Sequence, residues 1–148
     1  GIEAEERICS CGELNHAEAF LGTEGLAKTY SKVFEIKTDL KPEEKHSVSP
    51  KMRKGVANSD SKWMAVQETY AKHLAIFLKK TFLDFQPEVI IIGGGIAFGN
   101  KALLEKTKEE LQKIAPKEMP GIELAWSGNN INLGAAKYAL EQLESKGE

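Results

Sequence analysis

The clearest pattern in the sequence is a helical spacing of apolar residues between Ser59 and Asp84. These residues recur at steps of three and four, which places them on one face of a helix. They are Trp63, Val66, Tyr70, Leu74, Phe77 and Leu78. Ser59, Asp60 and Ser61 precede the run and are all favourable N-caps. Pro87 follows it and disfavours helical backbone at the residue before it. We therefore predict one long amphipathic helix over residues 59–84.

Other segments of the chain carry a similar period. Residues 17–33 are apolar at helical spacing, but Gly22 and Gly25 interrupt them, so we expect two short helices or one kinked helix. Residues 101–114 form a further amphipathic helix, and a last one is expected from about Asn132. The chain is therefore predicted to be rich in helix.

The segment Pro87–Ala97 reads as a buried strand that ends in a turn of three glycines. Within it, Val89–Ile92 is β-branched, uncharged and not alternating, which is typical of a strand buried on both faces of a parallel sheet. Ile122–Trp126 is a second candidate strand, so the order predicts a βαβ unit near residues 88–126. Two strands make only a marginal sheet. We therefore expect an incomplete α/β fold, whose other strands come from sequence outside this chain or from another subunit.

The stretch Glu35–Val56 has the weakest pattern. It contains two prolines, Pro42 and Pro50, together with many charged residues and few apolar ones. Such a composition is typical of a turn-rich surface segment. We therefore interpret residues 35–56 as a flexible loop or excursion from the fold.

Composition places the chain among ordinary soluble proteins. Its 148 residues fit one domain or part of one, with 41% hydrophobic and 28% charged residues. The net charge of −2 argues against a nucleic-acid partner, because proteins that bind nucleic acids usually carry an excess of basic residues. No apolar run reaches the roughly 20 residues that span a membrane. Because only two cysteines occur and no secretory signal is evident, we expect a reducing cytoplasm.

The glycine turn is the first candidate binding site. Gly93, Gly94 and Gly95 end the strand, where α/β folds bind ligands, and glycines allow a flat ligand to approach the backbone. No Gly-Lys-Ser/Thr follows, and the spacing does not match a dinucleotide fingerprint. The turn alone is equally compatible with a nucleotide contact and with a plain tight connection.

A second candidate is a metal site near the N-terminus. Cys9, Cys11 and His16 could supply three of four zinc ligands, since thiolates and imidazole suit Zn²⁺. Spacing alone also allows two free thiols and a surface histidine. Glu18 is a third candidate, although an acid at a helix start can simply favour the helix dipole.

In combination these segments resemble the C-terminal half of sugar kinases of the ROK family (repressors, open reading frames, kinases), within the actin-like ATPase superfamily. The family pattern Cys-x-Cys-Gly-x-x-Gly-Cys-x-Glu is matched at Cys9, Cys11, Gly12 and Glu18. Asn15 stands in place of the pattern's Gly and His16 in place of its third Cys. The segments Glu18–Leu26, Pro87–Ile96 and Gly134–Ala136 also resemble family segments in the same order.

This resemblance implies a function for each candidate. The fold would be part of an RNase H-like, actin-like ATPase domain, with residues 1–148 forming one partial domain. Glu18 would hydrogen-bond a hydroxyl of a hexose such as glucose, and Gly93, Gly94 and Gly95 would flank the adenosine of Mg²⁺-ATP. Cys9, Cys11 and His16 would hold a structural Zn²⁺. The parent enzyme would transfer the ATP γ-phosphate to a sugar hydroxyl.

The sequence lacks other parts of such kinases, namely an Asp-x-Gly-Gly phosphate loop, a catalytic Asp and a second phosphate loop. We therefore expect this polypeptide alone to be inactive and to belong to a larger enzyme or a homo-oligomer. The sugar-sensing part of a ROK repressor is an alternative, and an oligomerisation or zinc module is another.

Overall fold

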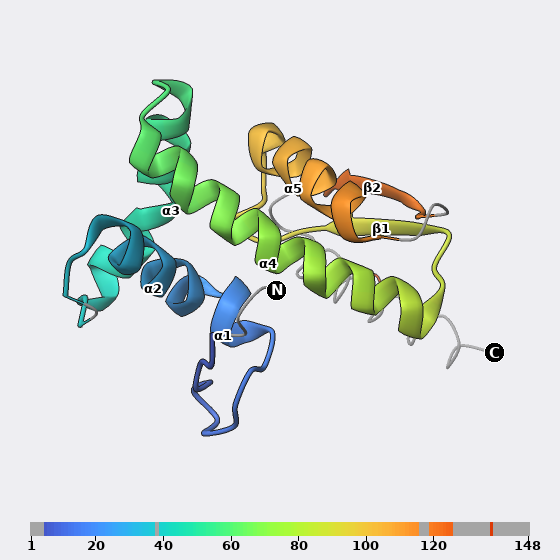
Figure 1. The fold of residues 1–148 in the computed structure, drawn as a ribbon, viewed down its shortest axis with the longest axis horizontal. Helices are drawn as coiled ribbons and strands as arrows, with labels where there is room; N and C mark the ends of the chain where they lie inside the picture. The colour runs from blue at the N-terminus through green and yellow to red at the C-terminus, as the bar shows by residue number, and fades with distance from the viewer. Residues whose placement is uncertain (1–4, 38, 116–118, 126–136, 138–148) are drawn as a thin grey trace.

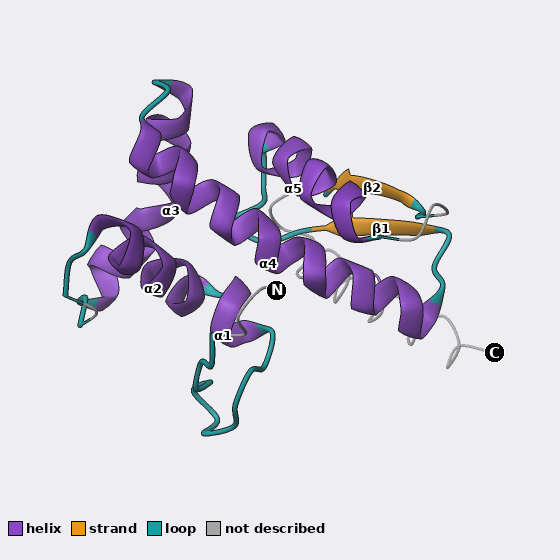
Figure 2. Cartoon of the chain, viewed as in Figure 1, coloured by secondary structure: helices purple, strands orange, loops and turns teal. Residues whose placement is uncertain are grey.

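The computed structural model describes residues 5–37, 39–115, 119–125 and 137. In this part of the chain most residues are helical and the sheet is small (Figure 2). The elements in chain order are α1 (Glu18–Leu21), α2 (Thr23–Phe34), α3 (Pro42–Ala57), α4 (Ser61–Phe85), β1 (Val89–Ile92), α5 (Lys101–Ile114) and β2 (Gly121–Leu124). Apart from Lys137, the predicted last helix lies outside the described residues, as does the end of the predicted second strand.

Helix α4 is the central element of the fold and contacts α1, α2, α3 and α5 (Figure 1). It begins where predicted, because the Asp60 carboxylate accepts hydrogen bonds from the backbone of Lys62 and Trp63 at 3.0 and 3.1 Å. It ends at Gln86, whose left-handed backbone precedes Pro87. The predicted break between α1 and α2 occurs at Gly22.

The predicted βαβ unit is confirmed. Strands β1 and β2 pair in parallel, with Val89 opposite Gly121 and Ile92 opposite Leu124, and α5 connects them. The Asn100 side chain caps α5 by accepting from Leu103 N at 3.1 Å.

Burial of β1 on both faces was predicted and is wrong for the described residues. Ile90 is buried, whereas its neighbours Val89 and Ile91 are 46% and 64% exposed. The reason is that the described helices cover one face, on which Ile90 and Ile122 join the core formed with α4 and α5.

The prediction of a flexible loop over residues 35–56 is also wrong, because α3 occupies Pro42–Ala57. The proline at its first position has a backbone suited to a helix start, and the Glu44 carboxylate accepts from Lys41 N at 2.8 Å. Val48 and Met52, one turn apart, are fully buried against α2 and α4. These few contacts hold a helix whose remaining surface is charged.

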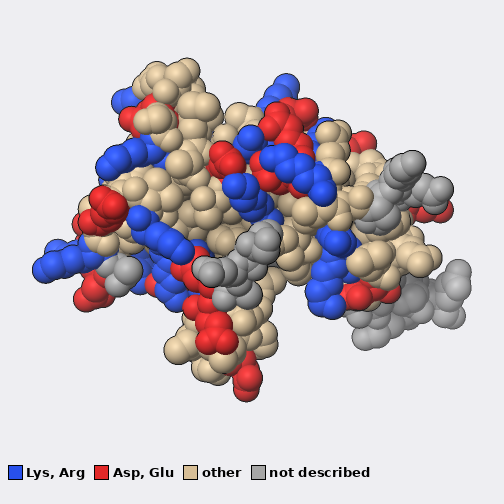
Figure 3. Space-filling view, in the orientation of Figure 1, with Lys and Arg blue, Asp and Glu red and all other residues tan. Residues whose placement is uncertain are grey.

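The charges on the surface are mixed in sign. On the face shown in Figure 3, Lys and Arg side chains are interspersed with Asp and Glu side chains over much of the surface. None of the described helices is long and apolar enough to cross a membrane.

Candidate functional site

A cavity of about 810 Å³ lies between α3, α4, the turn from α1 to α2 and the end of β1. Its volume is within the range of roughly 300–1,000 Å³ that is usual for small-molecule sites. Glu18 lines it from α1, and Gly93, Gly94 and Gly95 line it from the turn after β1. The cavity therefore brings together two candidates that are far apart in the sequence.

The glycine turn presents its backbone to this cavity. Gly94 has a φ of 101°, a conformation that side chains other than glycine rarely adopt, and its carbonyl accepts from Ala97 N and Phe98 N at 3.1 and 2.8 Å. A Cβ added to Gly94 or Gly95 would meet no atom within 4 Å. The main chain is thus open to a ligand at both positions.

Glu18 is held at the cavity wall by the turn that follows α1. Its carboxylate packs against Gly22 so closely that a Cβ at this glycine would overlap it. Burial, and next the neighbouring Glu18 carboxylate, raise the pKa of Tyr70 well above its usual value. The Tyr70 hydroxyl donates to Leu21 O at 2.6 Å, which links this turn to α4.

Helix α3 contributes a polar face that the sequence did not lead us to expect. His46, Ser49 and Arg53 line the cavity at helical spacing, and the Arg53 guanidinium donates from Nη1 to Phe98 O at 3.2 Å. This contact joins α3 to the end of the glycine turn. The signal for these residues was present in their three-and-four spacing, but it lay in the segment predicted to be a loop.

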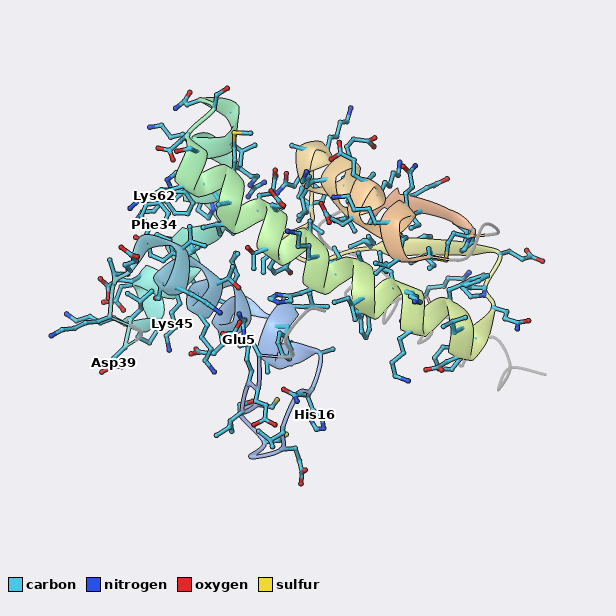
Figure 4. The ribbon with its side chains drawn as sticks, in the orientation of Figure 1. Glu5, His16, Phe34, Asp39, Lys45 and Lys62 are labelled. Carbon is cyan, nitrogen blue, oxygen red and sulfur yellow. The ribbon has the colours of Figure 1, made fainter. Side chains whose placement is uncertain are left out.

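The candidate metal ligands lie together on a hairpin-like loop at the N-terminal side. Cys9 N donates to Glu13 O at 2.9 Å and Asn15 N to Arg7 O at 2.8 Å. The ligand atoms of Cys9, Cys11 and His16 lie within 4.8 Å of one another, and Cys11 Sγ is 3.2 Å from His16 Nδ1. Figure 4 shows His16 on this loop, away from the helices.

These residues fit a zinc ion in chemistry and placement. A hydrogen bond from the Cys11 backbone lowers the pKa of the Cys9 thiol to about 7, with further bonds from the side chains of Cys11, His16 and Ser10, while burial opposes the shift. The thiolate is the form that binds metal. Ligand atoms on a tetrahedral Zn²⁺ are about 3.8 Å apart. Small movements of these three side chains would therefore bring their ligand atoms to the spacing that zinc requires. Among the described residues the cluster holds three ligands.

Arg7 connects this loop to the wall of the cavity. Its buried guanidinium donates from Nη1 to Gly25 O at 2.9 Å and from Nη2 to Thr29 Oγ1 at 3.2 Å. It also lies 4.9 Å from the centre of the Phe20 ring. The loop is thus tied to α1 and α2, and α1 carries Glu18. Sequence reasoning missed Arg7, since nothing in its surroundings marks it as buried.

Comparison with known proteins identifies the family. A sequence profile of the ROK family matches residues 1–141. The chain belongs to the ROK family. No curated protein sequence gave a match. The fold is similar to the crystal structure of a ROK hexokinase from Thermus thermophilus, with a TM-score of 0.65 and 23% identity. The similarity covers 93% of this chain and 44% of that hexokinase chain, so this ROK chain spans less than half of its length.

The family and structural matches confirm the expected fold class, a helix-rich and incomplete part of a ROK-family α/β fold. They also give a context for the two departures from the family pattern. Asn15 has a φ of 60°, a left-handed conformation that glycine adopts freely and asparagine tolerates best among the other residues. At the other departure, the imidazole of His16 lies where it can replace a thiolate as a ligand.

Proposed function

We propose that this ROK chain forms the sugar-binding wall and the adenosine-binding turn of an ATP-dependent hexose kinase. The enzyme would transfer the γ-phosphate of ATP to a hydroxyl of a hexose such as glucose. The observation that carries the proposal is the single cavity shared by Glu18 and the turn of Gly93, Gly94 and Gly95. A two-substrate phosphoryl transfer needs such an arrangement, because both substrates must meet in one space.

The chemistry of each wall fits its proposed ligand. A carboxylate accepts hydrogen bonds at both oxygens, so Glu18 can bind the hydroxyls of a sugar. The backbone of Gly94 and Gly95 faces the cavity without side chains, which leaves room for a nucleoside. Phosphoryl transfer depends mainly on positioning and on neutralising phosphate charge. Mg²⁺ would enter with the nucleotide and supply part of that neutralisation.

The chain alone is proposed to bind without catalysing transfer. Its sequence contains no Asp-x-Gly-Gly phosphate loop, and Glu18 is the only acid among the described residues that line the cavity. We assign Glu18 to sugar binding, so the general base and the phosphate contacts would come from the rest of the enzyme or from a second subunit. Cys9, Cys11 and His16 would hold a structural Zn²⁺ that fixes the loop next to α1. The cytoplasm, which supplies ATP and keeps thiols reduced, is the compartment that fits.

A kinase assay on the full-length protein tests this proposal. ADP release is measured with glucose and with other hexoses, for the wild type and for Glu18→Gln. We expect phosphorylation by the wild type and a KM for the sugar that is about 10- to 100-fold higher in Glu18→Gln, the cost of losing a charged hydrogen bond. Glu13→Gln, an exposed position on the metal loop, is the matched control and should leave the KM unchanged.

Two results would contradict the proposal. Absence of turnover with every hexose would contradict the proposed kinase function. Sugar binding without turnover would instead indicate the sensing part of a ROK repressor. If Glu18→Gln has the wild-type KM for every hexose, the proposed role of Glu18 in sugar binding is wrong.

A further inference from the structure

Helix α1, which carries Glu18, is too short to hold its own position. It has four residues, its N-cap Ala17 makes no side-chain hydrogen bond, and Gly22 N closes it by donating to Glu18 O at 3.0 Å. A helix of one turn is not stable by itself in water. The placement of the Glu18 carboxylate at the cavity therefore depends on the groups that contact the other residues of α1.

The buried guanidinium of Arg7 is one of these groups. Its Nη1 donates to Ala19 O of α1 at 3.5 Å and to Gly25 O of α2 at 2.9 Å, while its Nη2 donates to Thr29 Oγ1 of α2 at 3.2 Å. One planar group thus bridges the two helices that meet at Gly22.

The aromatic residue of α1, Phe20, also contacts Arg7. The guanidinium carbon lies 4.9 Å from the centre of the Phe20 ring, and His73 of α4 meets the same ring edge to face at 5.1 Å. The Tyr70 hydroxyl of α4 donates to Leu21 O, the last carbonyl of α1, at 2.6 Å. Helix α1 is therefore held by Arg7 and by α4.

Burial of the Arg7 charge is not the simplest way to stabilise this region. Its side chain is 2% exposed, and among the described residues Glu5 is the carboxylate that pairs with it, at 3.2 Å. A well-packed apolar residue often stabilises a protein as much as a buried ion pair does. Stability alone does not require an arginine here, whereas its rigid fork of donors can fix α1 relative to α2.

We propose that Arg7 is a positioning residue for sugar binding, which orients the Glu18 carboxylate by fixing Ala19 and Phe20 of α1. Arg7 is not among the residues that line the cavity, so it acts through Glu18 and not by touching the sugar. This inference rests on the proposed function, in which Glu18 binds a hydroxyl of the hexose. It extends the determinants of sugar affinity to a buried residue at the base of the metal loop.

A double-mutant cycle on the full-length protein tests it. Arg7→Lys keeps the charge that pairs with Glu5, but a single ammonium cannot reproduce the planar fork that bonds both helices. It is measured alone and together with Glu18→Ala, which removes the carboxylate. Thr29→Val is the matched control, because it removes a buried hydrogen-bond partner of Arg7 on α2 and leaves the contacts with α1 in place.

Three measurements are made on each variant. Calorimetry gives the Kd for glucose and for other hexoses, and the hexose that the wild type binds most tightly is used for the cycle. The kinase assay gives the KM for ATP. Thermal unfolding reports the melting temperature and whether the variant is folded.

We expect Arg7→Lys to raise the Kd for the sugar by about 5- to 50-fold, because a small displacement of a binding group weakens every interaction that it makes. The KM for ATP should not change. In the presence of Glu18→Ala the same substitution should change the Kd by less than about 2-fold, since residues that act through one group are not additive. Thr29→Val should lower the melting temperature and leave the Kd unchanged.

Three results would overturn the inference: an unchanged Kd in Arg7→Lys, an equal rise with and without the Glu18 carboxylate, or an equal rise in Thr29→Val. If Arg7→Lys does not fold, Phe20→Leu takes its place in the cycle, because it removes the ring that Arg7 contacts. The same dependence on Glu18 is expected for it, and independence from Glu18 would overturn the inference.

The sugar affinity can be measured without turnover. Absence of phosphorylation by the wild type would contradict the proposed kinase function, and a wild-type Kd in Glu18→Ala would contradict the role of Glu18. Hexose binding that depends on Glu18 but not on Arg7 would contradict the role of Arg7 alone. These failures are therefore distinguishable.

Discussion

His73 is expected to make the protein less stable as the pH falls from neutral to acidic values. It lies on α4 with its ring at 5.1 Å from that of Phe20, and its Nδ1 is buried without a hydrogen-bond partner in the described structure. Burial, the largest cause, together with the Arg7 and Lys32 charges lowers the pKa of His73 to about 4, while the Glu5 charge opposes the shift. The folded state therefore keeps this imidazole neutral.

The direction of the pH effect on stability follows from the protonation of His73 in the folded and unfolded states. An unfolded chain binds a proton at His73 near its ordinary pKa of 6.5, whereas the folded chain does so only near 4. Between these values protons bind preferentially to the unfolded state, so the free energy of unfolding falls as the pH is lowered through 6.5. The gap sets a ceiling of about 3 kcal/mol, of which about 2 kcal/mol would be lost by pH ~5. Because the ring is only partly buried, solvent screening reduces the expected loss to about 1 kcal/mol.

The substitution His73→Phe keeps an aromatic ring next to Phe20 and removes the titration. Urea unfolding at about pH 7.5 and about pH 5 gives the free energy for the wild type and the variant, and groups common to both cancel in the difference. We expect this difference to shift by about 1 kcal/mol in favour of the variant at the lower pH. The same substitution at exposed His46 supplies the baseline for removing a histidine from the surface. A difference that is independent of pH would refute the reasoning.

Four further substitutions test the site. Gly94→Ala should lower the free energy of unfolding by about 1–2 kcal/mol in urea titrations, because the left-handed backbone penalises a side chain. Gly95→Ala should leave stability unchanged but weaken adenosine binding, since its Cβ would enter the cavity. Equal stabilities of the two variants would contradict the effect expected for Gly94. Cys9→Ser should abolish binding of one zinc per chain, as measured by metal analysis, and retained zinc would exclude the proposed ligand set. Pro50→Ala should raise the melting temperature in thermal unfolding, because a helix-interior proline costs about 3 kcal/mol; an unchanged or lower melting temperature would contradict this.

The sequence allowed the elements with a strong period to be predicted, and α3 shows why others were missed. Its buried stripe consists of Val48, Met52 and Gly55, so only two large apolar residues mark a helix of sixteen residues. Pro50 suggested a break, yet the helix continues through it because packing against α2 and α4 compensates for the lost hydrogen bond. The capping signal at Pro42 and Glu44 was present but was not used.

The parts of the site that could be predicted are those whose residues are close together in the sequence. Cys9, Cys11 and His16 are near neighbours in sequence, so their clustering depends only on a short loop. Glu18 and the glycine turn could be paired only through the order of family segments. The approach of Arg53 to Phe98 depends on how α3 packs on α4, and no local pattern encodes that distance.

The conformation of Asn15 has a consequence for how relatives of this chain are found. Its φ of 60° shows that the loop requires a left-handed residue at this position and not glycine itself. The neighbouring His16 likewise keeps a donor atom where the family pattern has a sulfur. A search motif written as Gly-Cys would reject this loop, whereas one written as Gly or Asn followed by Cys or His would retain it. Genomic surveys that use the relaxed motif should therefore recover family members that the strict form has excluded.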